Sequence, residues 1–405
     1  MSAGRQITVL NHKNLSPPDG GTLRIQNFIS GLASRGHDVS FAYWGSRERE
    51  TFGTHIVNVR KPPARFLQRL ASMVYGGEEG KAAVELLLCN YPTMFMKLHP
   101  NLKTSSVLQA EQIWSAAIPL LYRKMFNKVT VLDDHNVEAL LAQRLYPYVK
   151  NKSTYSYWMK YVSLLERTCC NLADQIIVTS DIDKVNLEKF HKISQNKISV
   201  IPNGSDVNKY RPDCSLCSGT RMALGIGETD QVLTYVGRGT YPPNKMAIDY
   251  IKDTLAPKIW EEFPNARFMI VSRDLPADYF GSDNRFIHIT DDYDYPFINA
   301  SDICLAPLAV GGGTRIKIAN YLACGKPVVS TPMGCEGIPA RHMKEIVLSS
   351  MEEFPSSVKA LIQNPSTRDE MGRKAREFAV SNCSWEKSIL ELDRLYSGLW
   401  SKNAN

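Results

Sequence analysis

The residue types and spacings best suited to chemistry lie between positions 308 and 340. Three consecutive glycines, at 311–313, open a short amphipathic run that carries Arg315 and Lys317. A glycine-rich loop that leads into a helix leaves backbone N–H groups unpaired at the positive end of the helix dipole. Such an end binds anions, and two cations in the first turn strengthen it. The pattern predicts an anion site whose contacts are Gly313, Thr314, Arg315 and Lys317.

Two further cations belong to similar settings. Arg238 follows the β-branched run at 231–236, and Arg24 lies one turn beyond the glycine pair Gly20 and Gly21. The glycine pair comes after a strand and loop and before a helical pattern, so it allows a phosphate to approach the backbone closely. Each feature has a plainer interpretation: a tight turn for the glycines, a turn residue for Arg238, and a solvated charge for Arg24 or Lys317.

His135 directly follows the strand pattern at 129–132. A histidine at the carboxyl end of a parallel strand is well placed to hydrogen-bond a ligand or a reacting centre. A structural histidine is the alternative, and Glu138 is either functional or an ordinary carboxylate at a helix start. Asp133 with Asp134, and Asp292 with Asp294, invite a metal interpretation, but we expect no metal.

Composition indicates a folded protein of more than one domain. The 405 residues are 43% hydrophobic and 22% charged, and a chain of this length exceeds one ordinary core. No apolar stretch approaches the roughly 20 residues of a membrane span, and the N-terminus lacks the organisation of a signal peptide. The nine cysteines form no regular framework, so we expect reduced thiols in a cytoplasmic protein. The single CxxC, at 214–217, favours a loop over a zinc site.

The positive charge is unevenly distributed. Residues 1–207 hold 25 Lys and Arg against 17 Asp and Glu, an excess of +8, whereas the rest of the chain is nearly neutral. This indicates an anionic partner for the first half, and the absence of a recognised motif argues against nucleic acid. Residues 60–75 form a basic amphipathic pattern that suits an anionic membrane surface; packing on its own domain is the alternative. The basic and aromatic stretch at 146–161 supports the membrane interpretation.

Strand patterns alternate with helical ones in two series, which predicts an α/β protein with two doubly wound parallel sheets. The turn-forming segment at 202–212 separates the series. We expect an N-terminal domain at 1–205, a C-terminal domain at 206–385, and a last helix, 386–405, that packs back on the first domain. The predicted strands are residues 7–10, 38–43, 129–132, 175–179, 198–201, 231–236, 267–271, 286–289, 302–306, 327–331 and 345–348.

The motifs, in this order, resemble the family 4 retaining glycosyltransferases of the GT-B fold. They are GG at 20–21 with Arg24, RGHDV at 35–39, DHNVE at 134–138, VIPNG at 200–204, VGR at 236–238, YPPN at 241–244, ASDI at 300–303, GTRIK at 313–317 and GKPVVS at 325–330. The resemblance implies two Rossmann-like domains facing a central cleft. It also implies transfer of a sugar from a nucleotide sugar, without a metal or another cofactor, and a nucleotide base cradled by the loop at 291–294.

One departure from the family concerns two glutamates that are commonly separated by seven residues. They fall at Gly312 and Asn320 in this chain. Glycine at the first position occurs in a subgroup, but the second glutamate usually accepts hydrogen bonds from the ribose hydroxyls. Asparagine keeps one acceptor oxygen and loses the charge. We expect Asn320 to contact the nucleotide, and three consequences are open: weaker donor binding, a nucleotide that is held differently, or loss of activity.

These observations favour a cytoplasmic, peripherally membrane-associated glycosyltransferase. We expect His135, Arg238 and Lys317 to be catalytic and the acceptor to be a glycan or a lipid-linked precursor. The alternatives are a catalytically silent GT-B-like protein that binds a glycan or a partner, and a GT-B sugar epimerase or phosphorylase.

Overall fold

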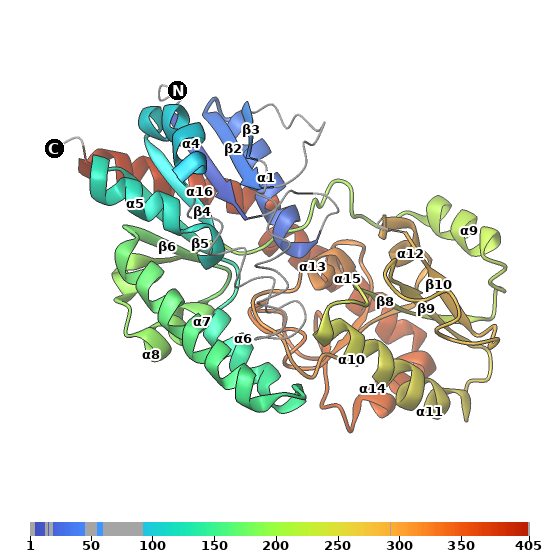
Figure 1. Ribbon diagram of the computed structural model, residues 1–405. Helices are drawn as coiled ribbons and strands as arrows, with labels where there is room; N and C mark the ends of the chain where they lie inside the picture. Colours follow the sequence, from blue (N-terminus) through green and yellow to red (C-terminus); the bar gives the residue numbers. More distant parts are fainter. Residues whose placement is uncertain are drawn as a thin grey trace. The chain divides into compact units, whose positions relative to one another are not determined.

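The computed structural model describes residues 5–12, 15, 19–44, 55–59, 92–291 and 293–403. The chain forms two compact units (Figure 1). Unit 1 is Met1–Pro202 together with Ser388–Asn405, and unit 2 is Asn203–Lys387. The boundaries expected from the sequence lie within a few residues of these. The amphipathic pattern at 60–75 lies outside the described residues.

Unit 1 contains a seven-stranded parallel sheet in the order β3-β2-β1-β4-β5-β6-β7. Because the chain runs outward from β1 and then returns to its other side, the sheet is doubly wound and has its topological switch point between β1 and β4. The strands are β1 (Gln6–Asn11), β2 (Asp38–Trp44), β3 (His55–Val59), β4 (Val107–Glu111), β5 (Val129–Asp134), β6 (Gln175–Val178) and β7 (Ile198–Val200). The helices are α1 (Gly20–Ser34), α4 (Pro92–Thr104), α5 (Ala117–Phe126), α6 (Glu138–Leu145), α7 (Lys152–Leu172) and α8 (Asp181–His191), with short 3-10 turns at Ile113–Ser115, Tyr146–Tyr148 and Gln195–Lys197.

The central strands of unit 1 are buried along their whole length. Every residue of β4, β5 and β6 is buried, as expected for a parallel sheet covered by helices on both faces. Two strands, β3 and β4, were absent from the sequence-based prediction. The omission of β4 matters, because its last residue is Glu111.

Unit 2 repeats the same topology with six parallel strands in the order β10-β9-β8-β11-β12-β13. Its switch point lies between β8 and β11. The strands are β8 (Gln231–Val236), β9 (Ala266–Val271), β10 (Phe286–Ile289), β11 (Ile303–Ala306), β12 (Val328–Ser330) and β13 (Val347–Leu348). The helices are α9 (Cys214–Ala223), α10 (Pro242–Tyr250), a π-helical turn (Ile251–Leu255), α11 (Ala256–Trp260), α12 (Tyr295–Ala300), α13 (Ile316–Ala323), α14 (Phe354–Gln363) and α15 (Pro365–Asn382).

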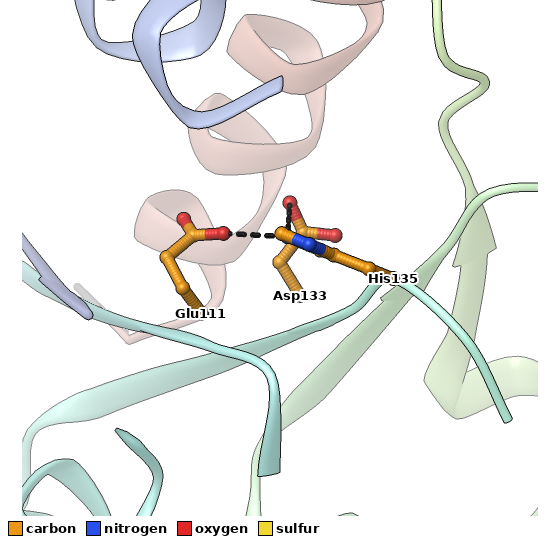
Figure 2. A group of neighbouring side chains, drawn as sticks. All are labelled: Glu111, Asp133 and His135. Carbon is orange, nitrogen blue, oxygen red and sulfur yellow. Dashed lines mark hydrogen bonds and ion pairs between the residues drawn. The ribbon is translucent and has the colours of Figure 1, made fainter. Parts of the chain in front are cut away.

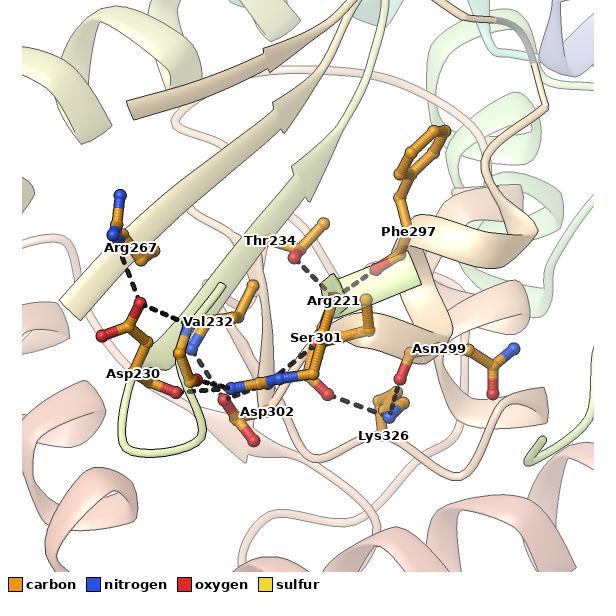
Figure 3. Close-up of polar contacts among 12 residues, drawn as sticks. Arg221, Asp230, Val232, Thr234, Arg267, Phe297, Asn299, Ser301, Asp302 and Lys326 are labelled. Carbon is orange, nitrogen blue, oxygen red and sulfur yellow. Dashed lines mark hydrogen bonds and ion pairs between the residues drawn. The ribbon is translucent and has the colours of Figure 1, made fainter. Parts of the chain in front are cut away.

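Polar contacts fasten the amino-terminal edge of the unit 2 sheet. Arg221 of α9 donates to the carbonyl oxygens of Gly227, Asp230 and Ala300 and to the carboxylate of Asp302. Asp302 also accepts from the backbone N–H of Val232 at 2.7 Å. Figure 3 shows these groups converging around the Arg221 guanidinium. They lie at the strand starts, so the carboxyl ends are left for ligands.

The last helix, α16 (Trp385–Asn403), packs on unit 1. Ile389 fills the space beside Gly31 of α1, where a Cβ atom would lie 2.4 Å from its Cδ1. His37 Nε2 lies 3.0 Å from Asp393 Oδ1, and the Arg5 guanidinium lies 4.3 Å from the centre of the Trp400 ring. Among the described helices, none is long and apolar enough to cross a membrane.

Candidate functional site

In unit 1, the carboxyl ends of β4 and β5 bring together Glu111, Asp133 and His135. His135 Nε2 lies 2.8 Å from Glu111 Oε2, and Figure 2 shows the imidazole beside both carboxyl groups. His135 is 7% exposed and Glu111 is fully buried. The pKa of Glu111 is raised by burial and by the Asp133 charge, and its hydrogen bonds to His135 and Gln109 oppose the rise. Glu111 therefore fixes the orientation of the His135 ring through the hydrogen bond at Nε2.

Arg24 is the buried counter-ion of this group. Its Nε lies 2.9 Å from Asp133 Oδ2 and its Nη2 lies 2.9 Å from Asp133 Oδ1, while Nη1 donates to the carbonyl oxygen of Ile201 at 3.0 Å. Both side chains are fully buried. This placement corrects the expectation that Arg24 contacts a phosphate or an acceptor, because the enclosed guanidinium ties α1 to β5 instead.

His135 presents its other ring nitrogen to the glycine pair. A Cβ atom at Gly21 would lie 3.1 Å from Nδ1 of His135, and Nδ1 has no hydrogen-bond partner within the part of the chain that the structure describes. Gly20 is the first residue of α1, whose capping box is formed by Asp19 and Thr22. His135 and Gly21, which belong to separate sequence motifs, therefore lie together at one edge of the sheet.

Glu111, Asp133 and His135 also meet a distance criterion for a metal site, since their ligand atoms lie within 4.8 Å of one another. The donor set does not fit a cation well. Asp133 is held by the Arg24 guanidinium through both oxygens, and a divalent ion beside that guanidinium would be repelled. The Asp133 carboxylate is therefore already neutralised by Arg24.

The loop after His135 is fixed by Glu166 of α7. Its carboxylate accepts from the N–H groups of Glu138 at 2.5 Å and Ala139 at 3.1 Å, which caps α6, and also contacts His191 Nε2 at 2.5 Å. Burial, followed by the Glu166 charge, raises the pKa of Glu138 to about 7. The two carboxyl oxygens of Asp134 have no hydrogen-bond partner among the described residues, and burial together with neighbouring carboxylates holds the pKa of Asp134 well above the usual value.

In unit 2, Lys317 of α13 lies at the sheet's switch point. Its Nζ donates to Tyr235 OH and to Asn244 Oδ1, each at 2.9 Å. Burial and then the Arg315 charge lower the pKa of Lys317 to about 7. Gly237, just after β8, makes room for this group, because a Cβ atom there would lie 2.8 Å from Nζ.

Arg238 lies next to Gly237 and remains partly exposed. Its Nε donates to Asp274 Oδ2 at 2.8 Å, and its side chain is 37% exposed. Thr240 donates to the same carboxylate oxygen at 3.0 Å. The guanidinium is thus oriented through one nitrogen at the carboxyl edge of the sheet, and the sequence-based assignment of Arg238 as an anion contact stays a prediction.

The glycine-rich loop is closed by Arg315. Its Nη1 donates to the carbonyl oxygens of Gly312, at 3.0 Å, and Gly313, and a Cβ atom at Gly311 would lie 2.3 Å from Nη2. Gly313 has φ +64°, a conformation that favours glycine. We expected Arg315 to face an anion; in the structure it folds back over its own loop.

Thr314 and Asn320, two further residues expected to contact the nucleotide, are hydrogen-bonded to residues at the start of unit 2. Asn203 Nδ2 donates to Thr314 Oγ1 at 2.9 Å. Ser205 Oγ donates to Asn320 Oδ1 at 2.8 Å, and Asn320 is only 5% exposed. Asn320 Oδ1 thus already accepts one hydrogen bond inside unit 2, and the expectation that it contacts a ribose hydroxyl stays a prediction.

Comparisons with known proteins agree with this architecture. A family model described as Glycosyltransferase Family 4 matches residues 18–209, and one described as Glycosyl transferases group 1 matches residues 230–364. A D-inositol 3-phosphate glycosyltransferase of Segniliparus rotundus is 23% identical over 233 residues, covering 53% of this chain and 50% of that protein. The chain spans half or less of the length of the curated relatives it matches.

Solved structures share the fold over nearly the whole chain. Sucrose-phosphate synthase from Thermosynechococcus elongatus superposes with a TM-score of 0.77 at 15% identity, covering 98% of this chain and 100% of that one. HepE of Anabaena, solved in complex with UDP and glucose, gives 0.72 at 15% identity, covering 97% and 99%. At this identity the likeness establishes the two-domain α/β GT-B fold.

Proposed function

The chain belongs to the family 4, group 1 glycosyltransferases, and from this premise we propose that it transfers a sugar from a nucleotide-sugar donor with retention of anomeric configuration. The observation that carries the proposal is the pair of cationic side chains at the carboxyl edge of the unit 2 sheet. Lys317 and Arg238 lie there beside the glycine loop that opens α13. Retaining transfer leaves negative charge on the departing diphosphate, and preorganised donors stabilise that charge.

Unit 1 supports a separate role for His135. Its Nδ1 lies beside Gly21, while Glu111 holds Nε2 from the opposite side. A ring fixed in this way suits a hydrogen bond to a substrate hydroxyl, and we propose this role for it. Arg24 and Asp133 act indirectly, by stabilising the end of β5.

We propose a glycan or lipid-linked acceptor, reached by a cytoplasmic protein that associates peripherally with an anionic membrane. The exposed stripe of α7 supports this proposal. Tyr157, Tyr161 and Leu164 are 68%, 40% and 66% exposed, and the basic residues Lys160 and Arg167 share their face of the helix. Exposed aromatic and basic side chains on one helix face suit a lipid interface.

Two measurements test the donor proposal. A thermal-shift screen over UDP, GDP, ADP and CMP sugars should show one series that raises the melting temperature, because a ligand that binds only the folded state stabilises it. The stabilising donor should then yield free nucleotide (a nucleoside diphosphate for the first three series) when a lipid-linked or glycan acceptor is added. Stabilisation without release in the presence of acceptors would favour a binding protein, and no stabilisation by any of the four series would contradict the proposal.

A further inference from the structure

The first turn of α6 takes its cap from a different helix. Val137, the residue before α6, has an apolar side chain that cannot cap the helix. Glu166 of α7 does so instead: its Oε1 accepts from the backbone N–H of Glu138 at 2.5 Å, and its Oε2 accepts from that of Ala139 at 3.1 Å. A carboxylate suits this place, because the N–H groups of a first turn have no partner within the helix and form the positive end of its dipole.

Glu166 is in turn held by α8. His191, the last residue of α8, has its Nε2 at 2.5 Å from Oε2 of Glu166, and the two side chains are 1% and 0% exposed. Because the Glu166 carboxylate accepts from backbone N–H groups, we assign a hydrogen to His191 Nε2 as well. One buried carboxylate thus joins α6, α7 and α8, which lie together in unit 1 (Figure 1).

The segment fixed by this cap carries His135. On its amino-terminal side, Asp133 is bound by the Arg24 guanidinium through both carboxylate oxygens. On its carboxyl-terminal side, the N–H of Glu138 is bound by Glu166. Only four residues lie between these two anchors, so the place of His135 depends on both of them.

The hydrogen bond to Glu111 does not by itself determine where the His135 ring lies. That bond holds Nε2, whereas Nδ1 is the atom beside Gly21. A ring tied at one nitrogen can still pivot if its backbone moves. The loop is braced once more within itself, since Asn136 Nδ2 donates to Glu138 Oε1 at 3.2 Å. The direction of Nδ1 therefore requires that the start of α6 stays in place.

The same carboxylate fills a position where a ligand could otherwise bind. A helix start at the carboxyl edge of a parallel sheet is a common place for a phosphate, because its N–H groups point outward. At α6 this place is occupied by the fully buried side chain of Glu166. The start of α6 thus serves to hold the loop that carries His135.

We propose that Glu166 is a positioning residue for His135 and that His191 acts together with it. Glu166 is fully buried and acts through the loop: by capping α6 it sets the direction of His135 Nδ1. His191 keeps the Glu166 carboxylate turned toward that cap. The effect on the ring depends on unit 1 alone, whereas the effect on turnover rests on the proposed function, in which His135 binds a substrate hydroxyl.

The ring of His135 can be followed without a ligand. Its 13Cε1–1H signal is assigned by the loss of that signal in His135→Gln. Glu166→Gln keeps the volume of the side chain but leaves one oxygen as acceptor for three N–H groups. We expect the His135 signal to move in Glu166→Gln, while the signal of the exposed His342 in unit 2 stays in place.

Two substitutions of His191 test its part in the arrangement. Glutamine places an amide N–H near the position of Nε2, whereas leucine offers no donor. The His135 signal should move in His191→Leu and stay near its wild-type position in His191→Gln. Equal displacements in these two variants would remove His191 from the proposal.

A His135 signal that keeps its wild-type position in both Glu166→Gln and His191→Leu would overturn the proposal as a whole. Because His191→Leu leaves Glu166 itself in place, it also decides the question if Glu166→Gln does not fold.

Asp174 provides the matched control for stability. Its carboxylate holds the other end of β5, where it accepts from the N–H of Thr130 at 2.8 Å and from Arg123 Nε at 2.7 Å. Asp174→Asn and Glu166→Gln should each lower the melting temperature by about 2 to 4 °C, the shift expected for one lost hydrogen bond. Only Glu166→Gln should move the His135 signal. An equal displacement in Asp174→Asn would reduce Glu166 to a general stabilising contact and overturn its positioning role.

Turnover of UDP-glucose and calorimetric binding of UDP separate this inference from the proposed function. Glu166→Gln should lower kcat by about 100-fold, the loss that a displacement of about 1 Å can cause, and Asp174→Asn should keep the wild-type kcat. Both variants should bind UDP as the wild type does, because Lys317 and the glycine loop belong to unit 2.

Wild-type kcat in a Glu166→Gln variant whose His135 signal has moved would contradict the proposed role of His135. A wild type that neither binds UDP nor turns over UDP-glucose would count against this donor, while the His135 signal would still decide the role of Glu166.

Discussion

The ammonium nitrogen of Lys317 lies 4.2 Å from the centre of the Tyr235 ring and donates to the hydroxyl oxygen of the same residue. Tyr235 OH is also hydrogen-bonded to Asn244 Oδ1 at 2.8 Å, so the three side chains form a closed triangle. Lys317 is therefore held in one position before any ligand binds. This preorganisation is what a charge-stabilising group in catalysis requires.

Lys317→Ala should lower turnover by about 100-fold or more, the loss expected when one preorganised donor is removed from a developing charge. Release of nucleoside diphosphate in the presence of acceptor is the measurement. Lys258→Ala, an exposed lysine of α11, is the control and should keep wild-type turnover. Full activity of Lys317→Ala would remove Lys317 from the mechanism.

Gly237→Ala should also impair the site, because the added methyl group would lie 2.8 Å from Lys317 Nζ and 2.9 Å from Asn244 Cγ. We expect donor binding to weaken by about tenfold, or about 1.4 kcal/mol, as the lysine is displaced. Gly219→Ala has no atom within 4 Å of its new Cβ and serves as the control in the same calorimetric titration. Equal affinities in the two variants would show that the triangle tolerates displacement.

The sequence predicted the fold well because alternating buried strands and amphipathic helices are local patterns. The expectation of a two-domain α/β GT-B fold is confirmed. The strand β4 was missed because Gln109 and Glu111 interrupt its apolar pattern. Both side chains are buried, at 1% and 0% exposure. Their burial is explained by the hydrogen bonds from Gln109 to Glu111 and between Glu111 and His135.

The sequence motifs predicted the positions of the site residues more accurately than the contacts that these residues make. Gly21, His135, Lys317 and the glycine loop lie at the carboxyl edges of their sheets, where the motifs placed them. The role of Arg24 differs from expectation because it depends on a partner far along the chain, Asp133, which is 109 residues away. No local pattern reveals whether a polar side chain is already satisfied internally.

Glu111→Gln should reduce turnover by about 100-fold, the lower end of the range for the loss of one general acid–base group. The amide keeps the shape but changes the polarity presented to His135 Nε2, so the hydrogen-bonding of the imidazole ring is expected to change. The 15N chemical shifts of His135 should report this change while the melting curve remains cooperative. Unchanged shifts would mean that Glu111 does not determine the state of the imidazole.

The raised pKa of Glu138, about 7, predicts a pH dependence of stability. Because the folded state holds the proton more tightly than the unfolded chain, the contribution of this group to stability is greatest below the unfolded value of 4.5 and decreases as pH rises to about 7. Glu138→Gln should therefore be more stable than the wild type at pH 8, by about 1 kcal/mol after allowance for partial exposure. At pH 4 the difference should vanish.

Urea unfolding at the two pH values measures this difference, with the exposed Glu261→Gln as the control. A wild type as stable as Glu138→Gln at pH 8 would contradict a raised pKa of Glu138 in the folded state.

The membrane proposal predicts that charge reversal on α7 releases the protein from anionic vesicles. Lys160 and Arg167 flank the exposed Tyr161 and Leu164, and each basic side chain near such a surface contributes on the order of 1 kcal/mol. Lys160→Glu with Arg167→Glu should abolish flotation with phosphatidylserine vesicles at moderate salt. Arg65→Glu with Arg69→Glu, in the segment outside the described residues, should do the same if that segment also docks.

The control is a pair of exposed lysines in unit 2, Lys258→Glu with Lys387→Glu, which should leave flotation unchanged. Screening shortens the reach of charge to about 8 Å at physiological ionic strength, so wild-type flotation should weaken as salt rises. The variants on α7 and in unit 2 should bind nucleotide as the wild type does, because the altered residues lie on exposed helix faces. A wild type that fails to float at low salt would contradict membrane docking and would favour an acceptor in solution.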